Sequence, residues 1–251
     1  MRTLLAALLL ATGAPAFATA AQAFREGNFA EAVKQGHSEA TAASLVIAGR
    51  ATLNIAGYGL TDKAQAKAQI ALAERDFDAA IAKAPNNLEA RTYKAIAAGY
   101  RSKLDKSPGE ARESRKLMEA VLARDPNYAL ANAALGGWHG GAVATLGSFI
   151  ASTVLGASRK EAERYFAIAL AREPRNIIHP VTYAFTLLDL DADNAPQAKT
   201  LLKSAIAMPV GDAYDAQNRK GAQAVLALID KGDNKGARTL AKRIQPFGAV
   251  G

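Results

Sequence analysis

The sequence predicts an all-α protein built as a series of antiparallel helix pairs. Half of its 251 residues are apolar but only 6% are aromatic. Alanine supplies much of the apolar share, and this favours helices over sheets. A spacing of small and bulky apolar residues that ends in proline recurs along the chain. No stretch has the dense β-branched and aromatic character of a series of strands.

Residues 1–20 are expected to form a secretory signal peptide. Arg2 supplies a short positive start, an apolar run follows over residues 3–11, and Gly13 and Pro15 then break that run. The apolar run is shorter than the roughly 20 residues that a membrane-spanning helix needs. An ordinary N-terminal helix is the alternative interpretation.

Small residues at alternate positions place the expected cleavage after Ala20, or alternatively after Ala18. The sequence therefore predicts a periplasmic or secreted protein whose residues 21–251 form a single helical repeat domain. The chain contains no cysteine, so a lipoprotein anchor, a disulfide framework and a cysteine-based metal centre are excluded.

The recurring spacing predicts the second helix of each pair. A small residue is followed by a bulky apolar residue four positions later, by a small residue three positions after that, and then by proline. Steps of four and three stay on one face of a helix, and proline ends the helix because it cannot continue the hydrogen-bond pattern. The four matching sets are Ala73, Phe77, Ala80 and Pro85; Ser114, Met118, Val121 and Pro126; Ala162, Phe166, Ala169 and Pro174; and, loosely, Gln197, Leu201, Ser204 and Pro209.

This spacing resembles the second helix and exit turn of a tetratricopeptide (TPR) repeat. The first-helix signature of that repeat also occurs once, where Asn132, Leu135, Gly136 and His139 stand at the W-x2-L-G-x2-Y spacing. The resemblance implies a TPR-like helix-pair solenoid, which is a right-handed superhelix of antiparallel helix hairpins.

The array is expected to be divergent. Successive prolines of the pattern lie 41, 48 and 35 residues apart, whereas a standard repeat has about 34 residues. The register near residue 40 stays open, so the first two predicted pairs overlap. The expected pairs are 22–33 with 36–48, 40–57 with 62–84, 88–104 with 109–124, 128–150 with 158–173, 177–190 with 195–208, and 212–230 with 233–244.

One segment, Leu135–Pro174, carries a narrower resemblance. Its Trp138-His139 pair, the Leu155-Gly156 element and the repeat pattern that follows are similar to a TPR family that includes the eukaryotic regulators of microtubule dynamics and uncharacterised bacterial relatives. The resemblance implies the fold and no role in microtubule biology. The glycine pairs Gly136-Gly137 and Gly140-Gly141 depart from it, because bulkier residues are expected there.

Residues 126–158 contain no charged side chain. Small and hydroxyl-bearing residues interrupt the apolar part, and the repeat pattern crosses both ends of the window. We therefore expect buried helices of a soluble array, with a partner or lipid contact and a membrane span as the alternatives. If the window is soluble, residues 136–157 are the best candidates for a projecting functional insert, because insertions in repeat arrays fall on one face.

No metal or cofactor site is expected. The three histidines, His37, His139 and His179, are far apart in the sequence and have no carboxylate at metal-ligand spacing. The run from Asp189 to Asn194 resembles the start of a calcium loop, but it lacks the central glycine and the closing glutamate. We expect it to be a solvated turn that caps the helix beginning near Ala195.

The formal net charge of +8 is dispersed along the chain. The basic runs are not interleaved with aromatic residues, as a single-strand binder would require. The charges therefore predict solvated helix faces and no nucleic-acid partner.

The absence of nucleotide-binding and hydrolase motifs, together with the repeat, predicts a non-enzymatic scaffold for a protein or peptide partner. The first helices of such pairs line the concave face. A peripheral membrane protein that uses residues 126–158 and an unrecognised enzyme are the alternative functions. The partner-binding candidates are Tyr93, Tyr100, Trp138, His139, Tyr183 and Phe185.

Overall fold

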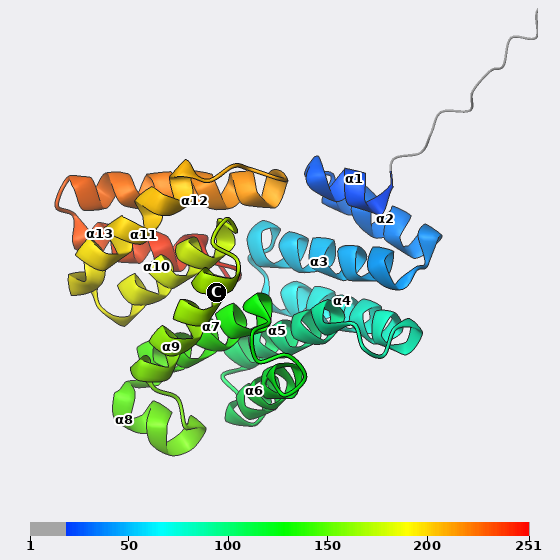
Figure 1. The fold of residues 1–251 in the computed structure, drawn as a ribbon, viewed down its shortest axis with the longest axis horizontal. Helices are drawn as coiled ribbons and strands as arrows, with labels where there is room; N and C mark the ends of the chain where they lie inside the picture. The colour runs from blue at the N-terminus through cyan, green and yellow to red at the C-terminus, as the bar shows by residue number, and fades with distance from the viewer. Residues whose placement is uncertain (1–18, 251) are drawn as a thin grey trace, which may run out of the picture.

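The computed structural model describes residues 19–250, and over this range the protein is helical with no strand (Figure 1). The predicted signal peptide lies outside the described residues up to residue 18, and Ala20 begins the first helix. The elements are α1 (Ala20–Arg25), α2 (Phe29–Glu39), α3 (Ala42–Gly59), α4 (Lys63–Lys83), α5 (Leu88–Asp105), α6 (Pro108–Leu122), α7 (Ala129–Leu146), α8 (Ser148–Ile150), the π-helical turn η1 (Ala151–Leu155), α9 (Arg159–Arg172), α10 (Ile178–Leu190), the 3-10 turn η2 (Ala192–Asn194), α11 (Ala195–Ala207), α12 (Ala213–Asp230) and α13 (Asn234–Ile244).

Neighbouring helices pack against each other all along the chain, so that α2 contacts α3 and α4 contacts α5 as well as the predicted partners. The pairs are α3 with α4, α5 with α6, α7 with α9, α10 with α11, and α12 with α13. Their bounds agree within four residues with five of the six predicted pairs. The first helices of successive pairs also touch, so that α3 contacts α5, α5 contacts α7, and α7 contacts α10.

The predicted pair 22–33 with 36–48 is wrong. The chain instead forms the short α1, then α2, and then the long α3. Gly27 has a φ of +83° in the left-handed region, which ends α1 inside the predicted helix. Thr41 starts α3 through a capping box with Ser44, so the second predicted helix is divided as well.

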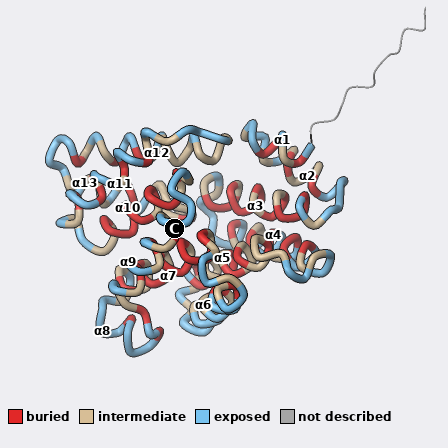
Figure 2. Tube along the Cα trace, in the orientation of Figure 1, coloured by how far each residue is buried: buried red, intermediate tan, exposed pale blue. Residues whose placement is uncertain are grey.

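The repeated small and bulky residues lie in the core of three predicted pairs, where Phe77 and Phe166 are fully buried. Figure 2 shows buried positions in red along α3, α5 and α7. Pro85, Pro126, Pro174 and Pro209 each follow the end of a second helix within four residues. The fourth set was predicted one residue out of register. In α11 the buried residues are Ala195, Ala198, Leu202 and Ala205, whereas Gln197 and Ser204 are exposed.

Glycines of two first helices leave room for aromatic rings of the second helices to pack against them. A Cβ added at Gly49 of α3 would lie 2.4 Å from the ring of Phe77 in α4. A Cβ added at Gly136 of α7 would lie 2.9 Å from the ring of Phe166 in α9. The same contact therefore occurs in two helix pairs, and it explains the glycine at position 136.

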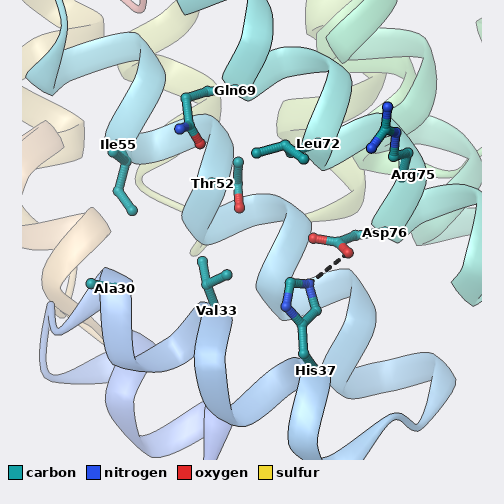
Figure 3. A pocket seen from close by; sticks show the side chains of 9 residues that line it. All are labelled: Ala30, Val33, His37, Thr52, Ile55, Gln69, Leu72, Arg75 and Asp76. Atoms are coloured by element: carbon teal, nitrogen blue, oxygen red, sulfur yellow. Dashed lines mark hydrogen bonds and ion pairs between the residues drawn. The ribbon is translucent and has the colours of Figure 1, made fainter. Parts of the chain in front are cut away.

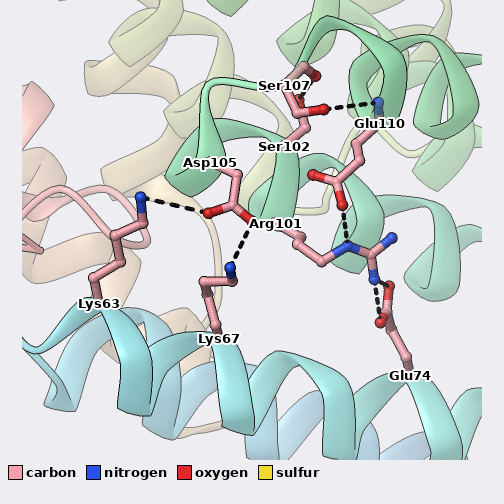
Figure 4. A network of polar contacts seen from close by, with 8 residues as sticks. All are labelled: Lys63, Lys67, Glu74, Arg101, Ser102, Asp105, Ser107 and Glu110. Atoms are coloured by element: carbon pink, nitrogen blue, oxygen red, sulfur yellow. Dashed lines mark hydrogen bonds and ion pairs between the residues drawn. The ribbon is translucent and has the colours of Figure 1, made fainter.

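Ion pairs also connect successive helices. Arg101 of α5 donates to Glu110 of α6 at 2.7 Å and also pairs with Glu74 of α4 (Figure 4). Lys67 of α4 pairs with Asp105 at the end of α5 at 2.8 Å. These half-exposed groups all find partners within the fold, so we assign them a structural role.

Candidate functional site

His139 is packed inside the fold. Its imidazole is buried, stacks on Tyr165 of α9, and accepts a hydrogen bond from the Ser158 backbone N–H at 3.3 Å through Nδ1. Burial, with a smaller contribution from the nearby Arg115, lowers the pKa of His139 to about 4. The ring is therefore neutral at pH 7 and helps to join α7 to α9.

Trp138, Tyr183 and Phe185 also contact neighbouring helices. The half-buried Trp138 donates its indole N–H to the Ala111 carbonyl of α6 at 2.9 Å. Tyr183 is buried and stacks on Phe166 with ring centroids 4.6 Å apart. Phe185 belongs to the buried core that α10 shares with α11, α12 and α13.

Tyr93 stands beside a charged group on α3. The guanidinium of Arg50 lies over the Tyr93 ring at 5.2 Å and over the Phe24 ring of α1 at 4.7 Å. Arg50 also donates to Glu89 of α5 at 3.2 Å. We call these four residues, Phe24, Arg50, Glu89 and Tyr93, the Arg50 cluster; they come from three helices.

The electrostatics of the Arg50 cluster favour a charged guanidinium. Burial lowers the pKa of Arg50, but the fields of Tyr93, Glu89 and Asp212 outweigh that effect and leave it raised. Burial also raises the pKa of Tyr93 to about 12, so its phenol stays protonated. A guanidinium has five N–H donors, and in the described structure one of them is hydrogen-bonded to Glu89. The cluster therefore holds a charged guanidinium against two aromatic rings, with N–H groups that make no other hydrogen bond in the described structure.

Two tyrosines join α12 to the same region. The Tyr58 ring at the end of α3 meets the Tyr214 ring at the start of α12 edge-on, with hydroxyl oxygens 3.5 Å apart. Burial and the neighbouring Tyr214 raise the pKa of Tyr58 well above its usual value. The start of α12 therefore lies next to α1 and α3, although 156 residues separate Tyr58 from Tyr214.

A separate open recess of about 470 Å³ lies between α2, α3 and α4 (Figure 3). At one end the imidazole Nε2 of the half-exposed His37 contacts Asp76 Oδ1 at 2.7 Å. Burial raises the pKa of Asp76, although the hydrogen bond to His37 acts in the opposite direction. The rest of the lining is largely apolar, including Val33, Ile55 and Leu72. We interpret the His37–Asp76 pair as a link between α2 and α4.

The run of aspartates after α10 forms a tight turn. Asp191 accepts a hydrogen bond from the Asp193 backbone N–H, which caps the 3-10 turn η2 and not α11 as predicted. Asn194 precedes α11 without a side-chain cap. Within residues 19–250, no group of three or more His, Asp and Glu side chains gathers closely enough to hold a metal ion.

The uncharged window divides into a packed part and a projecting part. Its first helix, α7, packs on α5, α9 and α10 and ends at Leu146, just before Gly147, whose φ is +76°. The following turns expose Phe149 at 82% of its surface, together with Ile150 and Val154. We call these three residues the apolar tip. Of the helices between residues 19 and 250, none is both long and apolar enough to cross a bilayer.

Sequence reasoning identified Tyr93 and Tyr100 on α5 but missed Arg50, Phe24 and Glu89. One signal was present in the sequence, because Arg50 is the only charged residue among the 18 residues of α3. A lone charge within an apolar helix indicates a buried or partnered group. Its partners could not be identified in this way, since Glu89 lies 39 residues further along the chain.

No protein-family model matches this chain, and no curated protein matches its sequence.

Proposed function

We propose that this protein is a TPR-like scaffold in which the first helices of successive pairs form the binding face. Three observations support the proposal. Each helix of a predicted pair contacts its partner. The first helices of these pairs, α3, α5, α7 and α10, touch in series. The glycine-to-ring contact recurs at Phe77 and Phe166. Export through the segment 1–20 stays a prediction, as does the absence of catalysis.

The Arg50 cluster is the observation that carries the function. It combines a charged guanidinium with two aromatic rings on helices α1, α3 and α5. A guanidinium recognises a peptide carboxylate through hydrogen bonds, and the half-buried Tyr93 ring beside it supplies apolar contact area. We therefore propose that the partner is a peptide segment with an acidic side chain next to an apolar or aromatic one.

Replacing Arg50 with alanine is expected to weaken the binding of such peptides by at least about tenfold, because a charge-assisted hydrogen bond contributes roughly 1.5–3 kcal/mol. Peptides would be selected from a displayed random library against residues 21–251. Their affinities for the wild type and for Arg50→Ala would then be measured by fluorescence anisotropy.

Arg172→Ala is the matched control for Arg50→Ala. Arg172 is exposed in the last turn of α9, so its loss should leave peptide affinity unchanged. The proposed function fails if no peptide is selected. It also fails if the selected peptides bind Arg50→Ala as tightly as they bind the wild type.

A second candidate function, association with a membrane surface, is favoured by the apolar tip. Phe149, Ile150 and Val154 project from the fold, and Arg112 and Arg115 donate to backbone carbonyls of the same loop. Exposed apolar side chains that can enter the headgroup region, flanked by basic residues, are typical of proteins that bind anionic lipid.

Replacing Phe149 and Ile150 together with serine is expected to abolish such binding, since both side chains would then lack the apolar surface that enters the lipid. The measurement is co-flotation with vesicles of phosphatidylglycerol and phosphatidylethanolamine. Leu72→Ser, which alters an exposed leucine of α4, is the control. Wild-type protein that stays out of the vesicle fraction at low salt would rule out this candidate.

A further inference from the structure

The segment after the last helix, residues 245–250, folds back onto α3 and α5. Phe247 is buried 4.9 Å from the Tyr100 ring, in the core that contains Leu53 and Leu104. This segment therefore lies against the same two helices that carry Arg50 and Tyr93, closer to their C-terminal ends.

The contacts of this segment resemble those of a bound peptide. Its Phe247 backbone N–H donates to the Gly57 carbonyl of α3 at 2.7 Å, and the Lys103 Nζ of α5 donates to the Pro246 carbonyl at 3.3 Å. Gly57 permits the close approach, because a Cβ there would lie 3.1 Å from the Pro246 side chain. An aromatic anchor in an apolar recess with backbone hydrogen bonds at each side is a common mode of peptide recognition.

The backbone of the segment is held in a costly conformation. Phe247 has a φ of +61°, which is rare for a residue with a side chain. Such a conformation persists only where surrounding contacts impose it, and it is often found at ligand clamps and switch regions. Residues 245–250 carry no charge, so the ring and the backbone hydrogen bonds supply the attachment.

We propose that the recess formed by Leu53, Gly57, Tyr100 and Leu104 is a peptide subsite for an uncharged Pro-aromatic-Gly segment of a partner protein. The chain's own Pro246-Phe247-Gly248 fills this subsite and competes with the partner. The inference rests on the proposed function and extends the binding face from the Arg50 cluster along α3 and α5. A partner peptide that reaches the subsite must displace Phe247.

The test uses the full chain and a labelled, end-blocked peptide with the sequence of residues 245–250. A tethered segment competes at an effective concentration of the order of millimolar. The Phe247→Ala chain, with its anchor removed, should bind the peptide at least tenfold more tightly than the wild type. Changing the phenylalanine of the peptide to alanine, or adding Tyr100→Ala to the chain, should abolish binding.

Gly248→Ala provides a second way to open the subsite, because its Cβ would lie 2.1 Å from the Lys242 carbonyl while Phe247 remains. The proposal is overturned if either variant keeps its helical circular dichroism and fails to bind the peptide. Loss of helical signal in both variants would assign the segment to the folded core and would overturn it as well. If the wild-type chain is a dimer and Phe247→Ala is a monomer, the recess binds a second copy of this chain. That result would overturn the proposal of a separate partner.

The outcome is separable from that of the proposed function. Binding of peptides at the Arg50 cluster depends on Arg50, whereas binding of the 245–250 peptide depends on Tyr100 and Phe247. Failure of the 245–250 peptide leaves the Arg50→Ala result unaffected. If the selected peptides do not depend on Arg50 but the 245–250 peptide binds, peptide recognition is restricted to the recess.

Discussion

Replacing Phe77 with alanine is expected to lower the free energy of unfolding by about 3–5 kcal/mol. The ring is fully buried, stacks on Tyr93 at 5.8 Å and fills the space over Gly49. Alanine would leave a cavity between α4 and α3, because the glycine cannot fill it. Urea unfolding, followed by far-ultraviolet circular dichroism and extrapolated linearly to water, measures the change.

Leu72→Ala is the matched control for Phe77→Ala on the same helix. Leu72 is 45% exposed, so its truncation removes little buried surface, and the free energy of unfolding should change by less than about 1 kcal/mol. Similar losses in the two variants would contradict the burial of Phe77. The contrast also tests the predicted second-helix spacing, in which position 77 faces the core.

Replacing Gly140 with alanine is expected to lower the free energy of unfolding by about 1–3 kcal/mol, which is the usual cost of overpacking. Its Cβ would lie 2.1 Å from the Thr186 Cγ2 of α10. Thr186 is buried, and its hydroxyl donates to the Thr182 carbonyl at 2.9 Å, so the methyl group cannot turn away without losing that hydrogen bond. The same urea titration measures the effect.

The neighbouring Gly141 is the control, since a Cβ added there would meet no heavy atom within 4 Å apart from its chain neighbours and the backbone of its own helix. Gly141→Ala is expected to stabilise the protein by about 0.4–1 kcal/mol, because alanine reduces the freedom of the unfolded chain. Adding Thr186→Ser to Gly140→Ala removes the clashing methyl group and keeps the hydroxyl, so stability should recover. A neutral Gly140→Ala would show that α7 and α10 are not in close contact there.

These two glycines show where sequence reasoning reaches its limit. Both depart from the expected pattern of bulkier residues, and no local rule distinguishes one helical glycine from the next. The contact with Thr186 explains position 140, whereas position 141 has no neighbour to accommodate. The distinction depends on α10, whose residues begin some 40 positions later.

Some residues of the proposed binding face could be located on a helix from the sequence. Tyr93 and Tyr100 were expected on the binding face and both lie on α5 beside α3. The Arg50 cluster could be identified only from the tertiary structure, because its members come from α1, α3 and α5. The recess for Phe247 could likewise be identified only from the tertiary structure, since Phe247 packs against residues as far as nearly 200 positions earlier in the sequence.

The sequence by itself determined that the protein is helical, and it located most helix pairs. Helical periodicity and proline termination are local effects, acting over three to five residues. The tertiary structure decided the register of α11, the division of the first predicted pair, the partners of Arg50 and the return of residues 245–250 onto α3. Each of these depends on which distant surfaces fit together, and side-chain packing between helices is not encoded in any short window of sequence.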